Sequence, residues 1–170
     1  MDLYYEIDSP SCLSVIVTAA ALNINLNLKK MSLMVEKNHL TPEYTKLNPQ
    51  QTIPTLVDNG FALAESRAIN IYLAEKYGKD DSLYPKDHKI RSVINQRLFF
   101  DMGSLETHLL NYFLHWFYGK PQDSQDLKKF EKALVALNTF LEENNYVLLE
   151  LKLLPLLTFQ CTQHFWHFLT

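Results

Sequence analysis

The pair Asn59-Gly60 separates two short runs of strand-forming residues and leaves few structures open to the first part of the chain. An Asn-Gly pair favours a tight hairpin, because a type I′ turn needs positive φ at both central positions. The hairpin leads into a helical pattern at residues 65–77, where apolar residues recur at helical spacing. Gly78 is predicted to close this helix in a left-handed conformation.

Strand-like runs at residues 2–5 and 25–30 flank a helical segment at residues 11–22, so the predicted order is β-α-β followed by β-β-α. The sequence changes character near residue 80, where a charge-rich segment with Pro85 predicts a linker. We therefore expect two units.

The second unit is predicted to be helical. One long helix is expected from about residue 90 to residue 118, and a second carries leucines and a phenylalanine at steps of three and four over residues 127–141. The two are expected to pack as an antiparallel hairpin around residues 119–123, with both apolar stripes in the core.

Composition excludes several classes of function. The 170 residues are 47% hydrophobic and 21% charged, which is typical of a globular protein. With 16 Lys and Arg against 19 Asp and Glu, nucleic acid is not an expected partner. The most apolar stretch, residues 147–159, is interrupted by Glu150, Lys152 and Pro155, so no membrane span is predicted.

Cysteine and histidine usage points to a reducing compartment without a metal site. Cys12 and Cys161 are too far apart to suggest a disulfide framework, and no signal peptide opens the sequence, so a cytoplasmic protein is expected. The six histidines occur singly, apart from His164 and His167, and predict no metal centre.

Ser9 lies between the first predicted strand and helix. It can simply cap the helix, with Pro10 at the first helical position. Alternatively, a hydroxyl at the positive end of the helix dipole can donate to an anion such as a thiolate. Such a bond is worth roughly 1.5–3 kcal/mol, about one to two units of thiol pKa. Serine in place of the first cysteine of a Cys-x-x-Cys pair excludes dithiol exchange, and Cys12 is expected to be buried.

Two further loops offer binding groups. At Ile53-Pro54 a plain turn is one interpretation; a cis bond that turns the peptide groups of Ile53 toward an extended ligand is the other. After the hairpin, Ser66 can cap the next helix and Arg67 can be solvated. Free N–H groups there would also suit a ligand carboxylate, with Glu65 taking an ammonium.

Taken together, these motifs resemble the N-terminal domain of cytosolic glutathione transferases. The residues that carry this resemblance are Ser9, the run Asn-Pro-Gln-Gln-Thr-Ile-Pro-Thr-Leu at 48–56 and Glu-Ser-Arg-Ala-Ile at 65–69. The insect delta class in particular is suggested by residues 55–63, 75–79, 82–86 and 94–103. The resemblance covers roughly residues 1 to 146.

The resemblance implies an α/β thioredoxin-like domain with a mixed four-stranded sheet at residues 1–79 and an all-α domain at residues 86–170. It implies conjugation of glutathione, a co-substrate rather than a cofactor, to small hydrophobic electrophiles by a cytosolic homodimer. Ser9 corresponds to the catalytic serine. The positions that correspond to glutathione-binding ones are Ser9, His39, Gln51, Thr52, Ile53, Pro54, Glu65, Ser66 and Arg67. An electrophile site is implied at Leu109, Phe113 and Phe117.

The sequence departs from the family pattern near the thiol and glycine ends of the site. Gln51 stands where the class usually has histidine, and a neutral amide should bind a carboxylate less tightly. Asp8 replaces a common glycine and would raise the thiol pKa if its side chain pointed inward. Pro10-Ser11 inverts the usual order of a small residue and proline.

The largest departure begins near residue 147, after which nothing matches the family, so the helical domain is expected to be shortened and atypical. We interpret this tail as the product of a frameshift or an altered splice. Two alternatives to an active transferase therefore stay open: a catalytically impaired, transferase-like binding protein, or the non-functional product of a damaged gene.

Overall fold

The computed structural model describes residues 1–117 and 123–143 of the chain. The chain divides into two compact units, one formed by Met1–Tyr84 and the other beginning at Pro85. Among the described helices, none is both long and apolar enough to cross a bilayer.

The first unit contains a four-stranded mixed sheet in the order β2-β1-β3-β4. Strand β1 is parallel to β2 and antiparallel to β3, which is antiparallel to β4. This arrangement confirms the predicted thioredoxin-like fold. Its elements are β1 (Asp2–Tyr5), α1 (Pro10–Ala21), β2 (Asn27–Lys30), the 3-10 helix η1 (Asn38–Leu40), α2 (Pro42–Leu47), β3 (Thr55–Asp58), β4 (Phe61–Ala64) and α3 (Ser66–Tyr77).

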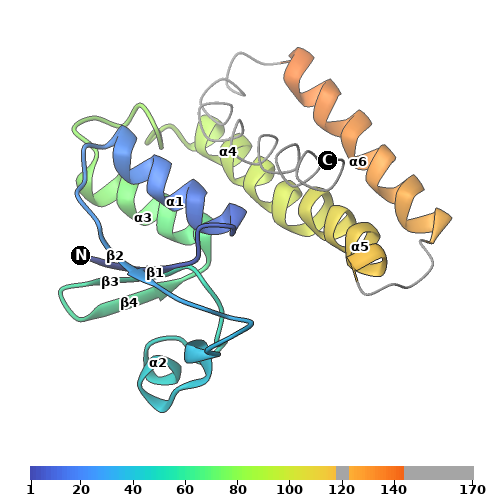
Figure 1. Ribbon diagram of the computed structural model, residues 1–170. Coiled ribbons are helices and arrows are strands. Elements are labelled where there is room, and N and C mark those ends of the chain that lie inside the picture. Colours follow the sequence, from blue (N-terminus) through green and yellow to red (C-terminus); the bar gives the residue numbers. More distant parts are fainter. Residues whose placement is uncertain (118–122, 144–170) are drawn as a thin grey trace. The chain divides into compact units, whose positions relative to one another are not determined.

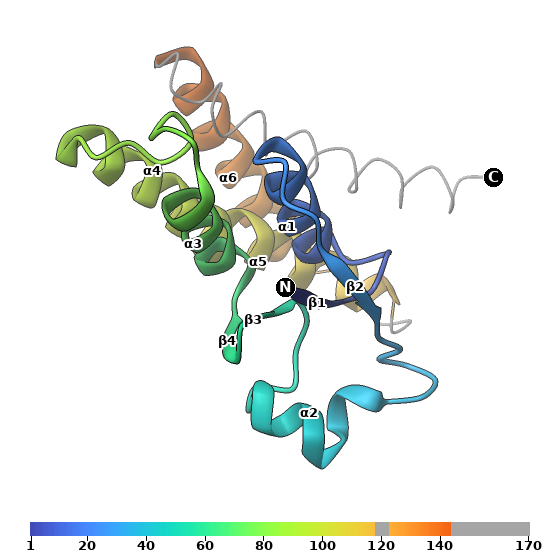
Figure 2. The ribbon, with the colours of Figure 1, turned by 90° about the vertical axis from the view of Figure 1, so that its left-hand side faces the viewer.

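Helices α1 and α3 lie together on one side of the sheet, and α2 lies on the other (Figures 1 and 2). Side chains alternate across a strand, so Leu3 of β1 and Leu56 of β3 face α1 and α3. Tyr4 and Thr55 face α2, where they contact Tyr44. The main core cluster consists of Leu3, Val15, Ala19, Leu56, Ile69 and Leu73, all buried.

The two glycine predictions had different outcomes. Asn59 and Gly60 have φ values of 49° and 85°, which confirms the hairpin turn. Gly78 was expected in the left-handed region, and this is wrong, because its φ is −60° and its ψ is 134°. The residue is glycine for a different reason: a Cβ there would lie 2.4 Å from the Ala74 carbonyl oxygen and 2.8 Å from that of Asp80.

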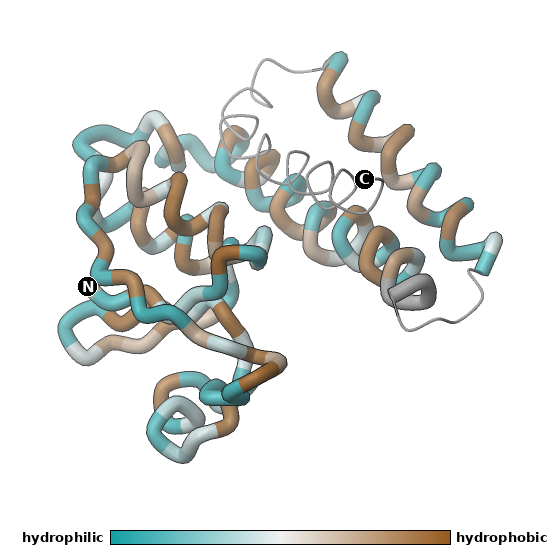
Figure 3. The backbone as a smooth tube through the Cα atoms, in the orientation of Figure 1, coloured by the Kyte–Doolittle hydropathy of each residue, from teal (hydrophilic) through white to brown (hydrophobic). Residues whose placement is uncertain are grey.

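The second unit contains α4 (His88–Phe100), a π-helical turn η2 (Asp101–Leu105), α5 (Glu106–Phe117) and α6 (Ser124–Glu143). The predicted long helix therefore contains a π turn. Helix α6 packs against α5 and alternates between apolar and polar along its length (Figure 3). Leu134 and Leu141 are exposed whereas Ala133 is buried, so the α6 stripe is not entirely core. The predicted connection at residues 119–123 falls mostly, and the tail after 147 entirely, outside the described residues.

Candidate functional site: loops at one end of the sheet

Three of the predicted site segments meet at one end of the sheet. Tyr4, Thr55 and Ala64 are in register across β1, β3 and β4. Since β1 and β4 run toward this end and β3 runs away from it, the loops that hold Ser9, Ile53 and Glu65 all adjoin it. The topology thus brings together segments that are far apart in the sequence.

Ser9 is the N-cap residue of α1. Its backbone is extended, with φ −90° and ψ 116°, and its Oγ accepts a hydrogen bond from the Cys12 amide at 3.3 Å. Pro10 follows at the first helical position, where a missing N–H costs nothing. The Ser9 side chain is half-buried, and within the described part of the chain no oxygen or nitrogen acceptor is recorded for its proton. A half-buried hydroxyl at this position is accessible to a ligand.

The neighbouring Cys12 is fully buried, as predicted. Burial raises the pKa of its thiol, and the Ser9 hydroxyl offsets part of that increase. A buried thiol with a raised pKa carries little thiolate near neutral pH and is a poor nucleophile. Asp8 is exposed, so water screens its charge.

The second segment enters β3 through a cis peptide bond between Ile53 and Pro54. Pro54 is buried, Ile53 is half-buried and Thr52 is exposed. Over the described residues, neither the N–H nor the carbonyl of Ile53 has a recorded hydrogen bond. Gln51 has φ 57°, and its Nε2 donates to Thr45 Oγ1 at 3.1 Å.

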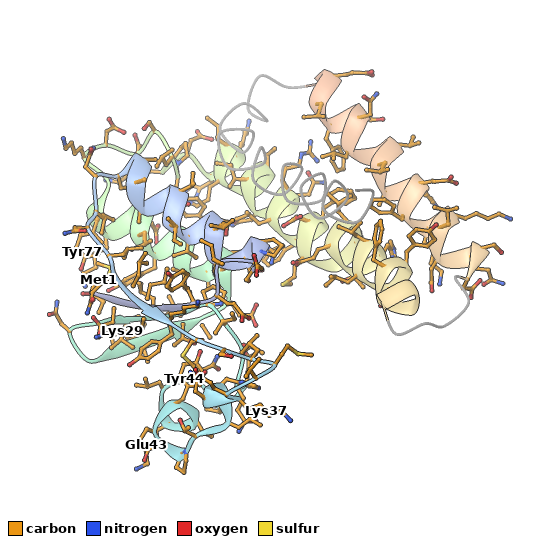
Figure 4. The ribbon with its side chains drawn as sticks, in the orientation of Figure 1. Met1, Lys29, Lys37, Glu43, Tyr44 and Tyr77 are labelled. Atoms are coloured by element: carbon orange, nitrogen blue, oxygen red, sulfur yellow. The ribbon has the colours of Figure 1, made fainter. Side chains whose placement is uncertain are left out.

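Behind this segment lie residues that sequence reasoning did not single out as functional. Tyr44 and Asn48 are 3% and 2% exposed, and both donate to the Thr52 carbonyl. Tyr44 lies between α2 and the sheet (Figure 4). An Asn before Pro49 is typical of a turn, but no sequence pattern indicates that its side chain is buried.

The third segment is Glu65-Ser66-Arg67. Glu65 is exposed and has φ 69° and ψ 108°, an unusual conformation for a residue with a Cβ. Such strain is found where the surrounding structure needs it, often at binding sites. Of the two interpretations of Ser66, capping is not observed, because Ser66 is the first helical residue and Glu65 occupies the cap without a side-chain bond. Ser66 is buried, and Arg67 Nη1 donates to its Oγ at 3.3 Å.

The remaining predicted residues lie elsewhere. His39 is in η1, half-buried, and its Nδ1 has no hydrogen-bond partner among the described residues. Leu109 and Phe113 are half-buried on α5, one turn apart, and belong to the second unit. Phe117 ends α5, and its side chain lies outside the described part. Within the described residues, no group of three or more His, Cys, Asp or Glu could hold a metal ion.

A thioredoxin-like domain with serine at the start of its first helix, followed by a helical unit, is the arrangement expected from the sequence for a glutathione transferase. The profile of the glutathione S-transferase N-terminal domain matches residues 1–75. A delta-class glutathione transferase of Nilaparvata lugens has 53% identity and a TM-score of 0.79, over 84% of this chain and 67% of that one. The chain belongs to the glutathione transferase family.

Two further solved structures of glutathione transferases are similar to this chain. A glutathione transferase of Bombyx mori has 51% identity and a TM-score of 0.79, over 83% of this chain and 65% of that one. Glutathione S-transferase 1-6 of Anopheles dirus species B has 48% identity and a TM-score of 0.78, with coverage of 84% and 68%. The chain thus spans about two thirds of the length of these relatives.

Proposed function

We propose that the chain binds reduced glutathione in its first unit and transfers it to small hydrophobic electrophiles. Glutathione is a co-substrate in this reaction, and the proposed reaction uses no cofactor. We further propose that the protein acts as a homodimer in the cytoplasm.

The Ser9 hydroxyl is the observation that carries this proposal. Its Oγ accepts from the Cys12 amide, which orients the hydroxyl at the start of α1, and we propose that its proton is donated to the glutathione sulfur when the ligand is bound. Donation to the thiolate favours the charged form and lowers the pKa of the bound thiol. A hydrogen bond to a charged group is worth about 1.5–3 kcal/mol. An exposed Asp8 does little to oppose this effect.

The other loops supply the binding groups for the tripeptide. We propose that the backbone of Ile53, flanked by Thr52 and Pro54, pairs with the cysteinyl unit. Glu65 and Ser66, with Arg67 beside them, hold the γ-glutamyl end: Glu65 takes the ammonium and the amides at the start of α3 take the carboxylate. Gln51 and His39 lie on the α2 side and bind the glycyl carboxylate.

The apolar face of α5 is proposed to contact the electrophile. Leu109 and Phe113 lie one turn apart on the same side of α5, and Phe117 continues the step of four in the sequence. Side chains of this type favour small apolar substrates over charged ones.

The test is glutathione conjugation to a chloronitroarene by the full chain, with Ser9→Ala, Ser9→Asp and Ser11→Ala in parallel. Aspartate is a good helix cap but cannot donate to a thiolate. We therefore expect both Ser9 variants to lose about 10- to 100-fold in kcat/KM, although only Ser9→Ala loses the cap. Ser11→Ala should keep the parent activity. Parent activity in both Ser9 variants would refute the role of Ser9.

A second candidate is a glutathione-binding protein with little or no turnover. It is favoured by Gln51, a neutral residue whose amide already donates to Thr45. Calorimetry with glutathione distinguishes the two: binding by the parent chain without turnover would support this candidate. If the folded protein shows neither glutathione binding nor turnover, both candidate functions are refuted.

A further inference from the structure

A buried network of hydrogen bonds lies directly behind the loop that carries Ile53. The Tyr44 hydroxyl donates to the Thr52 carbonyl oxygen at 2.5 Å, and Asn48 Nδ2 donates to the same oxygen at 2.8 Å. Thus two side chains from the α2 region converge on one backbone carbonyl.

The network also connects this carbonyl to the sheet. Thr55 Oγ1, on β3, lies 2.8 Å from the Tyr44 hydroxyl oxygen and 3.1 Å from Asn48 Nδ2. Asn48 Oδ1 accepts from the Gln50 amide at 3.0 Å. Burial raises the pKa of Tyr44, so its phenol remains a protonated donor. With Thr55 fully buried and Asn48 2% exposed, water has little access to replace any of these bonds.

The geometry of a peptide group links this network to the site. The peptide between Thr52 and Ile53 is planar and trans, so its N–H points away from its carbonyl. Since the carbonyl is held in the buried network, the Ile53 N–H must face the opposite way. No acceptor for that N–H is recorded in the described part of the chain.

We infer that Tyr44 and Asn48 are positioning residues that hold the Thr52 carbonyl and thereby aim the Ile53 N–H at the cysteinyl carbonyl of glutathione. This rests on the proposed function. Neither side chain needs to touch glutathione, because both act through one backbone peptide. The consequence is an effect on glutathione binding that is separate from the thiolate chemistry of Ser9.

The test compares Tyr44→Phe and Asn48→Ala with Tyr4→Phe. Tyr4 is the matched control, because its ring packs edge-on against that of Tyr44, with 5.4 Å between centroids, and no hydrogen bond of its hydroxyl is recorded among the described residues. Tyr44→Phe keeps its ring and its packing, so it decides the question if Asn48→Ala fails to fold.

The first measurement uses the free, isotope-labelled full chain. We expect the ¹⁵N order parameter of the Ile53 amide to fall from about 0.85, typical of rigid backbone, toward about 0.6 in Tyr44→Phe and Asn48→Ala. Tyr4→Phe should leave it unchanged. An unchanged order parameter in both network variants would overturn the inference whether or not the chain binds glutathione.

The second measurement is glutathione kinetics. Losing one of the two hydrogen bonds to the Thr52 carbonyl should raise the KM for glutathione about threefold to tenfold in each variant, while kcat at saturating glutathione stays within about twofold. If both network variants keep the KM of the parent chain, or if Tyr4→Phe raises the KM equally, the inference is overturned while the proposed function is untouched. Absence of glutathione binding by the folded parent chain would instead refute the proposed function.

Discussion

The hydroxyl of Tyr77, at the end of α3, donates a hydrogen bond to Oδ2 of Asp58 in β3, 19 positions earlier in the chain. The same oxygen accepts from the Tyr72 hydroxyl at 2.6 Å and from Lys76 Nζ at 2.8 Å. Asp58 is only 3% exposed. One carboxylate therefore joins the last turns of α3 to the hairpin that precedes it.

Asp58→Asn should destabilise the first unit. The carboxamide has no charge to pair with Lys76, and its neutral oxygen accepts from the Tyr72 and Tyr77 hydroxyls more weakly than a carboxylate does. We expect the free energy of unfolding to fall by about 1–3 kcal/mol, measured by chemical denaturation. Asp2→Asn is the control, because Asp2 makes one exposed bond, to Asn27. Equal stabilities for the two variants would contradict this prediction.

The same carboxylate predicts a pH dependence. Hydrogen bonds from Lys76, Tyr72 and Tyr77 lower the pKa of Asp58. A group with a lowered folded pKa contributes stability above its unfolded pKa, about 3.9, and loses it as pH falls through the folded value. The parent chain should therefore lose stability below about pH 4 more steeply than Asp58→Asn. Parallel stability curves for the two proteins between pH 5 and pH 2 would refute this.

Three glycines should respond differently to alanine. At Gly78 the new Cβ meets two backbone oxygens, so we expect a loss of about 1–3 kcal/mol. At Gly60 space is open but φ is 85°, so strain of about 1–2 kcal/mol is expected. Gly103 has open space and no positive φ, and its replacement should be neutral or stabilising. Thermal melts of the three variants give the order of their stabilities. A Gly78→Ala variant as stable as the parent would disprove the close approach of the backbone oxygens to Gly78.

Cys12 should be unreactive in the folded protein. In a Cys161→Ser background, we expect an aromatic disulfide reagent at pH 8 to label Cys12 only after denaturation, because the thiol is buried and its pKa is raised. Ser11→Cys in the same background offers a half-buried thiol on the same helical turn and should react faster. Rapid labelling of folded Cys12 would show that the first turn of α1 opens.

Gln51→His should make glutathione binding pH-dependent. A protonated imidazole forms a charge-assisted bond to the glycyl carboxylate, and histidine gains its proton near pH 6.5. Calorimetry should therefore give tighter binding by the variant at pH 6 than at pH 8, with a flatter profile for the parent. Gln50→His is the control, because Gln50 is the exposed neighbour of Gln51. The same pH dependence in both variants would mean that Gln51 does not face the carboxylate.

Much of the first unit could be predicted because its signals are local. Turn chemistry at Asn59-Gly60 and the cap at Ser9 each depend on a few adjacent residues, and the structure contains both. Gly78 shows where local reasoning fails. Its conformation is set by the carbonyls of Ala74 and Asp80, and no pattern in the sequence reports how closely those atoms approach.

The partners of the buried polar groups could not be predicted from local sequence patterns. Asn48 and Tyr44 look like an ordinary turn residue and an ordinary helical aromatic, yet they share Thr52 as a partner. Such pairings depend on how α2 folds back on the sheet. The exposure of Leu134 beside a buried Ala133 has a similar cause, because helical periodicity does not specify which side of α6 faces α5.

The π-helical turn at Asp101–Leu105 has a further consequence for α5. Its five residues widen the helix, and Thr107 Oγ1, in the first turn of α5, donates to the Met102 carbonyl at 2.7 Å. A π turn takes up one extra residue, so its five residues turn the chain about as far as four residues of an ordinary α-helix do. If the same five residues were α-helical, everything after them would rotate by up to about 100°. The π conformation of this turn therefore decides which side of α5 Leu109 and Phe113 occupy, and a change that made it α-helical would redirect that face without replacing any of its side chains.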